Sequence, residues 1–207
     1  MENYEEKRHG LTIKIYADED PQAPDDWGND NVFLVAYHQD FWVEGPKVFY
    51  KLPEGVKRDP RDKGHLLFSK DEVRDLLEKR GNKEYHVFGL EAYIHSSVRL
   101  ALSQEGNFCD RRWDVSQLGA VFVSKKEARI REKAENIARN LVDTWNDYLS
   151  GNVYNYLIED DSGEVIDSLS GIYGDYKENA LAEARALVDH LTESGKTDHH
   201  GQILINI

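Results

Sequence analysis

Apolar and polar residues alternate in several short segments, which is the pattern of strands with one buried face. Residues 11–17 alternate in this way, and residues 32–38 form the continuous apolar run of a buried strand. Residues 85–102 alternate over a length that fits one long strand or a hairpin. The other predicted strands are residues 118–123, 153–158, 164–169 and 202–207, the middle two joined by an acidic turn at 159–163.

Three other segments space their apolar residues by three or four, as amphipathic helices do. The first is short and covers residues 69–81. The longest begins with Ser124 and Glu127, which have the spacing of a capping box, and it ends near residue 149. The third is predicted to begin near Asp175. Together with the strands, these segments account for most of the chain.

Strands and helices are segregated along the chain, which favours the α+β class over a doubly wound sheet. We expect a mainly antiparallel sheet packed by two or three helices, with a ββαβ unit at the C-terminus. Because no low-complexity linker interrupts residues 1–207, we predict a single compact domain. A boundary inside that domain is possible near residue 150.

The cellular location follows from what the sequence lacks. Cys109 is the one cysteine, so no intrachain disulfide can form. The first residues are charged rather than apolar, unlike a signal peptide. The longest apolar runs are far shorter than the roughly 20 residues that span a bilayer. We therefore expect a cytoplasmic protein that does not associate with membranes.

Negative charge is concentrated in the last third of the chain. The net charge is −13, yet residues 61–140 hold 16 basic and 13 acidic side chains, whereas residues 141–207 hold 3 and 13. This balance repels phosphate backbones and argues against direct binding of nucleic acid. A basic protein is the partner that the charge favours.

We expect many of these carboxylates to share one acidic surface that could occupy a groove built for nucleic acid. A stiff loop with an aromatic anchor at Trp27 could join this surface, because Pro21 and Pro24 restrict it. A solvated surface that only keeps the protein soluble is the alternative interpretation. The candidate partner-binding residues are Asp18, Glu19, Asp20, Trp27, Asp160, Asp161, Glu164, Asp167, Asp175 and Glu178.

Catalytic motifs are missing from the sequence. It has no phosphate-binding glycine loop, no serine-hydrolase signature and no His-Glu-x-x-His zinc motif. Clustered carboxylates can still bind the metal ions that assist phosphoryl transfer. A metal-dependent nuclease that uses residues 18–20 with Asp110 or Asp114 is therefore an alternative hypothesis. Otherwise we expect no cofactor and no catalytic residue.

Three segments of the chain resemble a family of small acidic proteins from bacteriophages and mobile elements. They are residues 18–27, with Asp-Glu-Asp-Pro and a following Trp; residues 109–125, with Cys, Trp-Asp, Gly and Val-Ser-Lys; and residues 148–174. The family has no established activity. The charged connection at 53–64 and the length of the third helix depart from its pattern.

The resemblance implies an accessory protein that acts in the cytoplasm of a host cell. By analogy with other acidic proteins of such elements, it would inhibit a host defence complex that handles nucleic acid. Our leading hypothesis is thus a non-enzymatic inhibitor of the anti-restriction or anti-CRISPR type. The metal-dependent enzyme and a structural or regulatory oligomer are alternatives, and the oligomeric state is open.

Overall fold

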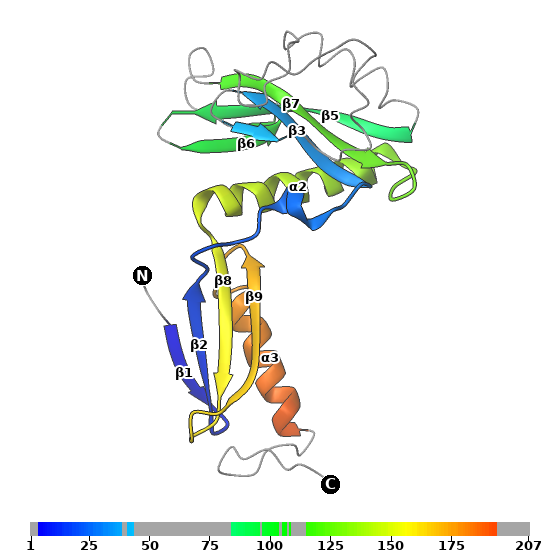
Figure 1. Ribbon diagram of the computed structural model, residues 1–207. Helices are drawn as coiled ribbons and strands as arrows, with labels where there is room; N and C mark the ends of the chain where they lie inside the picture. The colour runs from blue at the N-terminus through cyan, green and yellow to red at the C-terminus, as the bar shows by residue number, and fades with distance from the viewer. Residues whose placement is uncertain are drawn as a thin grey trace. The chain divides into compact units, whose positions relative to one another are not determined.

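Residues with a determined placement fall into two units, each with its own sheet (Figure 1). The terminal unit combines Met1–Gln22 with Asp147–Ile207, and the central unit is Ala23–Asn146. The computed structural model describes residues 4–38, 41–43, 84–95, 97–103, 105–106, 108 and 115–193. The predicted helix 69–81, the connection 53–64, Cys109 and the predicted strand 202–207 lie outside these residues.

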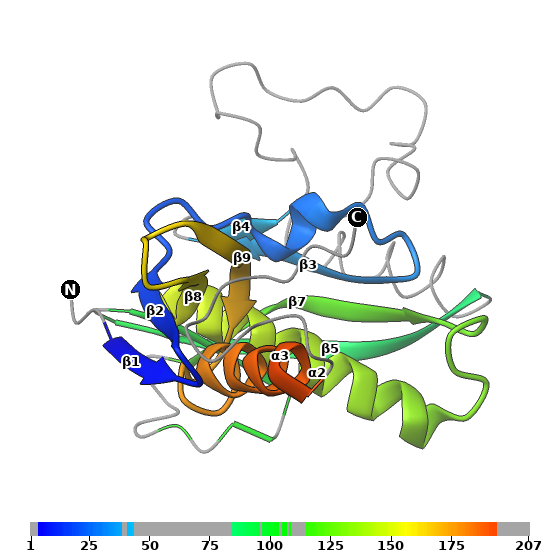
Figure 2. The same ribbon diagram turned by 90° about the horizontal axis from the view of Figure 1, so that it is seen from below.

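The terminal unit is a four-stranded sheet with one helix on one face. Its strands are β1 (Tyr4–Arg8), β2 (Leu11–Ala17), β8 (Val153–Glu159) and β9 (Val165–Tyr173), and its helix is α3 (Ala180–Glu193). The strands lie in the order β1-β2-β8-β9, and every pair is antiparallel. The helix packs over β2 and β8, the middle of the sheet (Figure 2).

Apolar and polar side chains alternate along the strands of this unit, so the apolar ones share one face and form the core. Ile13 lies opposite Ile158 and Ile15 lies opposite Tyr156, so these side chains share the face that α3 covers. The helix contributes apolar residues at spacings of three and four, as its sequence pattern predicts. The buried residues of the core are Leu11, Ile13, Ile15, Tyr156, Ile158, Ala180, Leu181, Ala184 and Val188.

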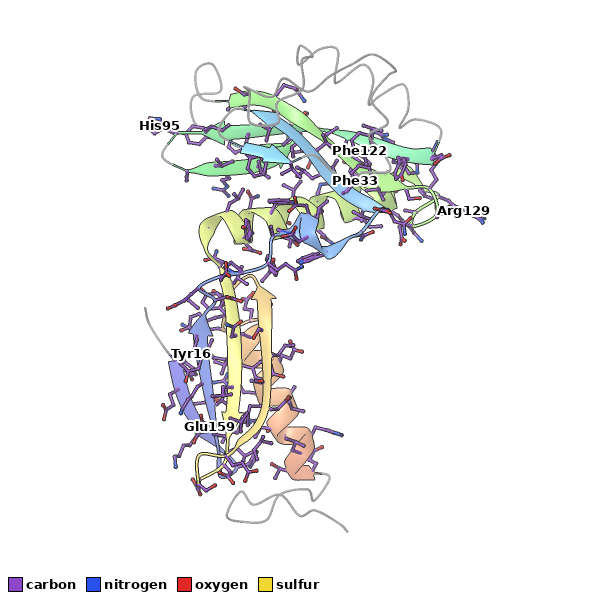
Figure 3. All side chains as sticks on the ribbon, viewed as in Figure 1. Tyr16, Phe33, His95, Phe122, Arg129 and Glu159 are labelled. Atoms are coloured by element: carbon purple, nitrogen blue, oxygen red, sulfur yellow. The ribbon has the colours of Figure 1, made fainter. Side chains whose placement is uncertain are left out.

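The central unit contains a five-stranded antiparallel sheet and a long helix. The strands are β3 (Val32–His38), β4 (Phe41–Val43), β5 (Tyr85–Ile94), β6 (Val98–Leu102) and β7 (Val115–Ser124), in the order β4-β3-β7-β5-β6. Most of α2 (Arg131–Ser150) belongs to this unit, as does the short 3-10 helix η1 (Pro24–Trp27). Phe33 and Phe122 stack with their ring centroids 5.0 Å apart (Figure 3).

The structure confirms the mixture of helices and mostly antiparallel strands that the pattern predicts. Residues 85–102 form a hairpin, β5 with β6, rather than one long strand. The predicted single sheet is instead two sheets, of four and five strands. In the C-terminal segment, β8, β9 and α3 follow one another as expected. The last strand of the ββαβ unit stays a prediction.

The predicted start of the long helix at Ser124 is wrong. Ser124 is the last residue of β7, and its amide donates to the carbonyl of Asn31 at 2.7 Å. Its Oγ accepts the amide of Lys126 at 3.2 Å, which stabilises a turn rather than a helix N-terminus. The helix begins at Arg131, so Ile130, which lies within the predicted helix range, is 57% exposed before the observed helix.

The third helix also begins later than predicted. Asp175 Oδ1 accepts the amides of Lys177 and Glu178, at 2.8 and 3.2 Å. These bonds stabilise a turn, and the regular helix follows from Ala180. The same residue types that cap helices also stabilise turns, so the sequence pattern places both helix starts several residues too early.

We predict that Asn146→Ala destabilises the protein by about 2 kcal/mol. The Asn146 side chain accepts the amide of Leu100 at 2.8 Å and donates to its carbonyl at 3.0 Å. It therefore joins α2 to the backbone of edge strand β6, and alanine leaves both groups unpaired. Urea unfolding measures the loss, with the exposed Asn140→Ala on the same helix as control. Equal stability of the two variants would contradict this role.

Candidate functional site

The terminal unit carries most of the negative charge. Its described residues, 4–22 and 147–193, contain 16 Asp and Glu but 5 Lys and Arg. The described residues of the central unit contain 10 acidic and 7 basic side chains. A functional surface that depends on negative charge is therefore to be sought on the terminal unit.

Nine of these 16 carboxylates lie at the two opposite ends of the sheet. Both β2 and β9 pair antiparallel with β8, so they run in the same direction and finish at the same end. Carboxylates follow each of these strands there, and we call this group the acidic end: Asp18, Glu19, Asp20, Asp175 and Glu178. The β8–β9 turn at the other end holds the hairpin end: Glu159, Asp160, Asp161 and Glu164. The seven residues of β8 separate the two groups by about 20 Å.

Hydrogen bonds connect the two segments of the acidic end. The amide of Asp18 donates to the carbonyl of Val153 at 2.8 Å, which continues the pairing of β2 with β8. The amide of Gly174 donates to the carbonyl of Asn152 at 2.9 Å. The Tyr173 hydroxyl donates to the carbonyl of Gln22 and so connects the loop after β2 to the end of β9. The acidic end is thus built on the sheet rather than on a separate loop.

Two of its carboxylates also shape the backbone. Asp18 Oδ1 accepts the amide of Asp20 at 3.1 Å, and Asp175 caps the turn before α3. The side chains of Glu19, Asp20 and Glu178 are exposed and accept no hydrogen bond from a described residue. Within the described part of the chain, none of the five carboxylates forms an ion pair. Their charge is therefore not neutralised by an ion pair with another side chain that the structure describes.

In the hairpin end, in contrast, two of the four carboxylates are paired with cations of β1 and β2. Lys14 Nζ lies 2.6 Å from Glu159, and Lys7 Nζ lies 3.1 Å from Asp161. Asp160 stabilises the turn itself, and the hydrogen bond from the Ser162 hydroxyl is the main reason that its pKa is lowered. Glu164 is left exposed, with no described cation beside it. The two acidic groups therefore differ in how much charge they present.

Further ion pairs hold α3 against β1. The Arg8 guanidinium donates to both carboxylate oxygens of Asp189, at 2.6 and 2.7 Å. Arg185 Nε donates to Glu6 Oε1 at 2.7 Å, and the Tyr4 hydroxyl donates to Glu6 Oε2 at 2.6 Å. The hydrogen bonds from Arg185 are the largest reason that the pKa of Glu6 falls to about 2. These carboxylates stabilise the unit instead of facing a partner.

The lowered pKa of Glu6 predicts a specific pH dependence of stability. A carboxyl whose pKa is depressed by folding stabilises the folded state above its unfolded pKa and loses that effect as the pH falls toward 2. Glu6→Gln should therefore be less stable than wild type at pH 7, with a difference that closes between about pH 5 and pH 2. Urea unfolding at several pH values measures this. The exposed neighbour Glu5→Gln should follow wild type, and a constant difference for Glu6→Gln would contradict the assignment.

Asp167 lies between the two acidic groups, on β9. Its Oδ1 accepts the amide of Ser168 at 2.8 Å, and its Oδ2 accepts the Tyr156 hydroxyl at 3.3 Å. Burial, followed by the nearby charge of Asp167, raises the pKa of Tyr156 to about 12. The tyrosine thus stays a hydrogen-bond donor at neutral pH, and the Asp167 side chain is partly exposed along the strand.

Trp27 belongs to the central unit, whereas Asp18–Asp20 belong to the terminal unit. Its side chain is 47% exposed at the end of η1, followed by Gly28 in the left-handed conformation. A small cavity of about 110 Å³ lies beside η1, lined by Pro24, Asp25, Phe33 and Trp145 among others. The predicted combination of Trp27 with the acidic loop stays a prediction.

Besides strands β1 and β4, sequence reasoning missed two surface features of the described chain. Val165 and Leu169 on β9 are exposed apolar side chains, although the alternation of 164–169 is typical of a half-buried strand. Lys125, Lys126 and Arg129 line a surface pocket of about 550 Å³ after β7. The run of basic residues at 125–133 was a signal for this pocket, but the helix predicted there obscured it.

The described residues do not support the hypothesis of a metal-dependent nuclease. They contain no group of three or more His, Cys, Asp or Glu side chains that could hold a metal ion. Asp110 and Asp114, one of which the hypothesis requires, lie outside them, so it stays a prediction. No helix in the part of the chain that the structure describes is long and apolar enough to cross a membrane.

The resemblance to phage and mobile-element proteins also stays a prediction, since no family model, curated protein or solved structure matches the chain.

Proposed function

We propose that this protein is a binding protein, without catalytic activity, that docks on a basic protein through the acidic end of its terminal unit. The observation that carries the proposal is the difference between the two acidic groups. Two of the four carboxylates of the hairpin end, Glu159 and Asp161, pair with Lys14 and Lys7, whereas those of the acidic end have no described cation within ion-pair distance. An external partner is the source of positive charge that would complement them.

The physical basis is electrostatic complementarity. Exposed carboxylates attract a basic surface over about a Debye length, and this attraction speeds association more than it adds affinity. The sheet and the bond from Tyr173 to Gln22 hold the carboxylates in place, so little conformational entropy is lost when the partner binds. The hairpin end contributes less, because forming a new contact there would disrupt existing ion pairs.

A surface that normally binds nucleic acid is the partner class that we propose. Such surfaces present clustered Lys and Arg to phosphates, and fixed carboxylates can occupy the same positions. The resemblance to mobile-element proteins leads us to propose a host complex that handles nucleic acid in defence. Occupation of its groove by this protein would inhibit it by excluding the nucleic acid.

Affinity capture from a bacterial host lysate tests this function. The immobilised full chain is incubated at about 50 mM salt and washed at increasing salt. We expect nucleic-acid-binding proteins in the salt-eluted fractions, and we expect added duplex DNA to displace them. Retained proteins that do not bind DNA, or that DNA does not displace, would contradict the proposal.

A further inference from the structure

Strand β9 forms one margin of the terminal sheet, and its outer edge is open among the described residues. In the order β1-β2-β8-β9 it pairs with β8 alone, and α3 lies over the middle of the sheet (Figure 2). Its nine residues extend less than about 30 Å, because Gly171 has φ +76° and the pairing with β8 is irregular at two places. The Ser168 amide donates to Asp167 and the Tyr173 carbonyl accepts from Asn179, so the edge offers its other backbone donors and acceptors to another strand.

The two edges of this sheet differ in their protection. The other edge strand, β1, has charged side chains at four of its five positions. In β9, Asp167 is the one charged residue of nine. Val165 is 53% exposed and Leu169 is 40% exposed, because α3 packs over β2 and β8 instead. Charged residues are the usual defence of an edge against unwanted pairing, and β9 lacks that defence.

Carboxylates lie at both ends of this edge. Glu164 directly precedes β9, and Asp175 and Glu178 follow it. Asp167 is the one charged residue between them, so negative charge lies at the two ends of β9 and at one position within it.

We propose that an extended, basic segment of a partner protein adds to β9 as a fifth strand of the terminal sheet. This inference rests on the proposed function, and it names the form that the partner takes. The incoming backbone would pair with the outer edge of β9, and its apolar side chains would cover Val165 and Leu169. Its Lys or Arg residues would lie near Glu164 at one end and Asp175 at the other. Strand addition of this kind takes affinity from the backbone and specificity from the side chains.

Charge decides between a basic segment and a second copy of this chain. The described residues of the terminal unit carry a net charge of −11, so two copies paired through β9 would bring like charges together. A basic strand would instead be attracted by the negative charges of the terminal unit. The partner is therefore complementary in charge as well as in backbone geometry.

Two synthetic nine-residue peptides of alternating lysine and valine test this inference. In the second, the backbone nitrogens of the five central residues are methylated, which keeps charge and side chains but removes the donors. NMR titration of the full chain should show binding of the first peptide, with shifted and more slowly exchanging amides in β9. The methylated peptide should bind at least tenfold more weakly. Equal binding of both peptides, or no binding of either, would overturn strand addition.

A pair of variants locates the contact. Val165→Thr with Leu169→Thr keeps β propensity and charge, and it should weaken the unmethylated peptide at least fivefold. The control, Ile130→Thr, changes an exposed apolar residue of the central unit and should have no effect. Unchanged affinity in the β9 variant would overturn the inference. If both peptides bind equally while the salt-eluted partner is still captured, strand addition fails and the proposed function stands.

Discussion

Replacing Glu19 and Glu178 by lysine should weaken capture of a basic partner by at least about tenfold at low salt. Both side chains are exposed at the acidic end, and neither forms an ion pair with a described residue. The double variant therefore reverses charge without removing a contact that the fold needs. The loss follows because a basic surface then meets like charge where it met carboxylates.

The matched control replaces Glu5 and Glu193 by lysine. Glu5 lies on β1, the opposite edge of the sheet from β9, and Glu193 is the last residue of α3. Both double variants change the net charge by the same amount, so only the position of the change differs. Dissociation constants by surface plasmon resonance compare them. If both weaken binding equally, net charge rather than the acidic end determines affinity.

Gly119→Ala should destabilise the protein by at least about 3 kcal/mol. Gly119 lies in β7, between Ala36 of β3 and Leu90 of β5. A Cβ built there would lie 1.9 Å from the carbonyl oxygen of Val35, a backbone atom that cannot move aside without opening the strand pair. The two central strand pairings of this sheet cannot both persist with that side chain present.

Gly163→Ala provides the control for this prediction. Gly163 has φ +85° in the β8–β9 turn, and a Cβ there meets nothing within 4 Å. The expected cost is that of the left-handed conformation alone, about 1–2 kcal/mol. Urea unfolding of both variants measures the difference. A Gly119→Ala protein as stable as Gly163→Ala would show that the close approach of Val35 is relieved elsewhere.

Local patterns predicted most of the described strands, but not β1 and β4, and not the helix starts. The alternation in residues 11–17 and 153–158 reflects burial of one face, which the sheet imposes directly. Ser124 and Asp175 carry the polar side chains that cap helices, yet here they stabilise turns. Because such a side chain can stabilise a helix cap or a turn, it does not determine where the helix begins. The packing of α2 and α3 determines their first residues instead.

The acidic residues were identifiable from composition, but their distribution was not. Sequence proximity suggests one surface after residue 140, whereas the order β1-β2-β8-β9 places the carboxylates at two ends. The cations that pair with two carboxylates at one end, Lys7 and Lys14, come from the beginning of the chain. Pairing of strands so distant in sequence leaves no local signal. The position of β9 at the margin of the described sheet follows from the same long-range order, and no local pattern predicts it either.

The salt dependence of partner binding tests the acidic end most directly. We predict that the dissociation constant of the captured partner rises at least about tenfold between 50 and 200 mM NaCl. In the Glu19→Lys, Glu178→Lys variant the residual binding should lose most of this dependence, whereas the Glu5→Lys, Glu193→Lys control should keep it. A dissociation constant that changes less than about twofold over this range in the wild type would contradict an electrostatic contact.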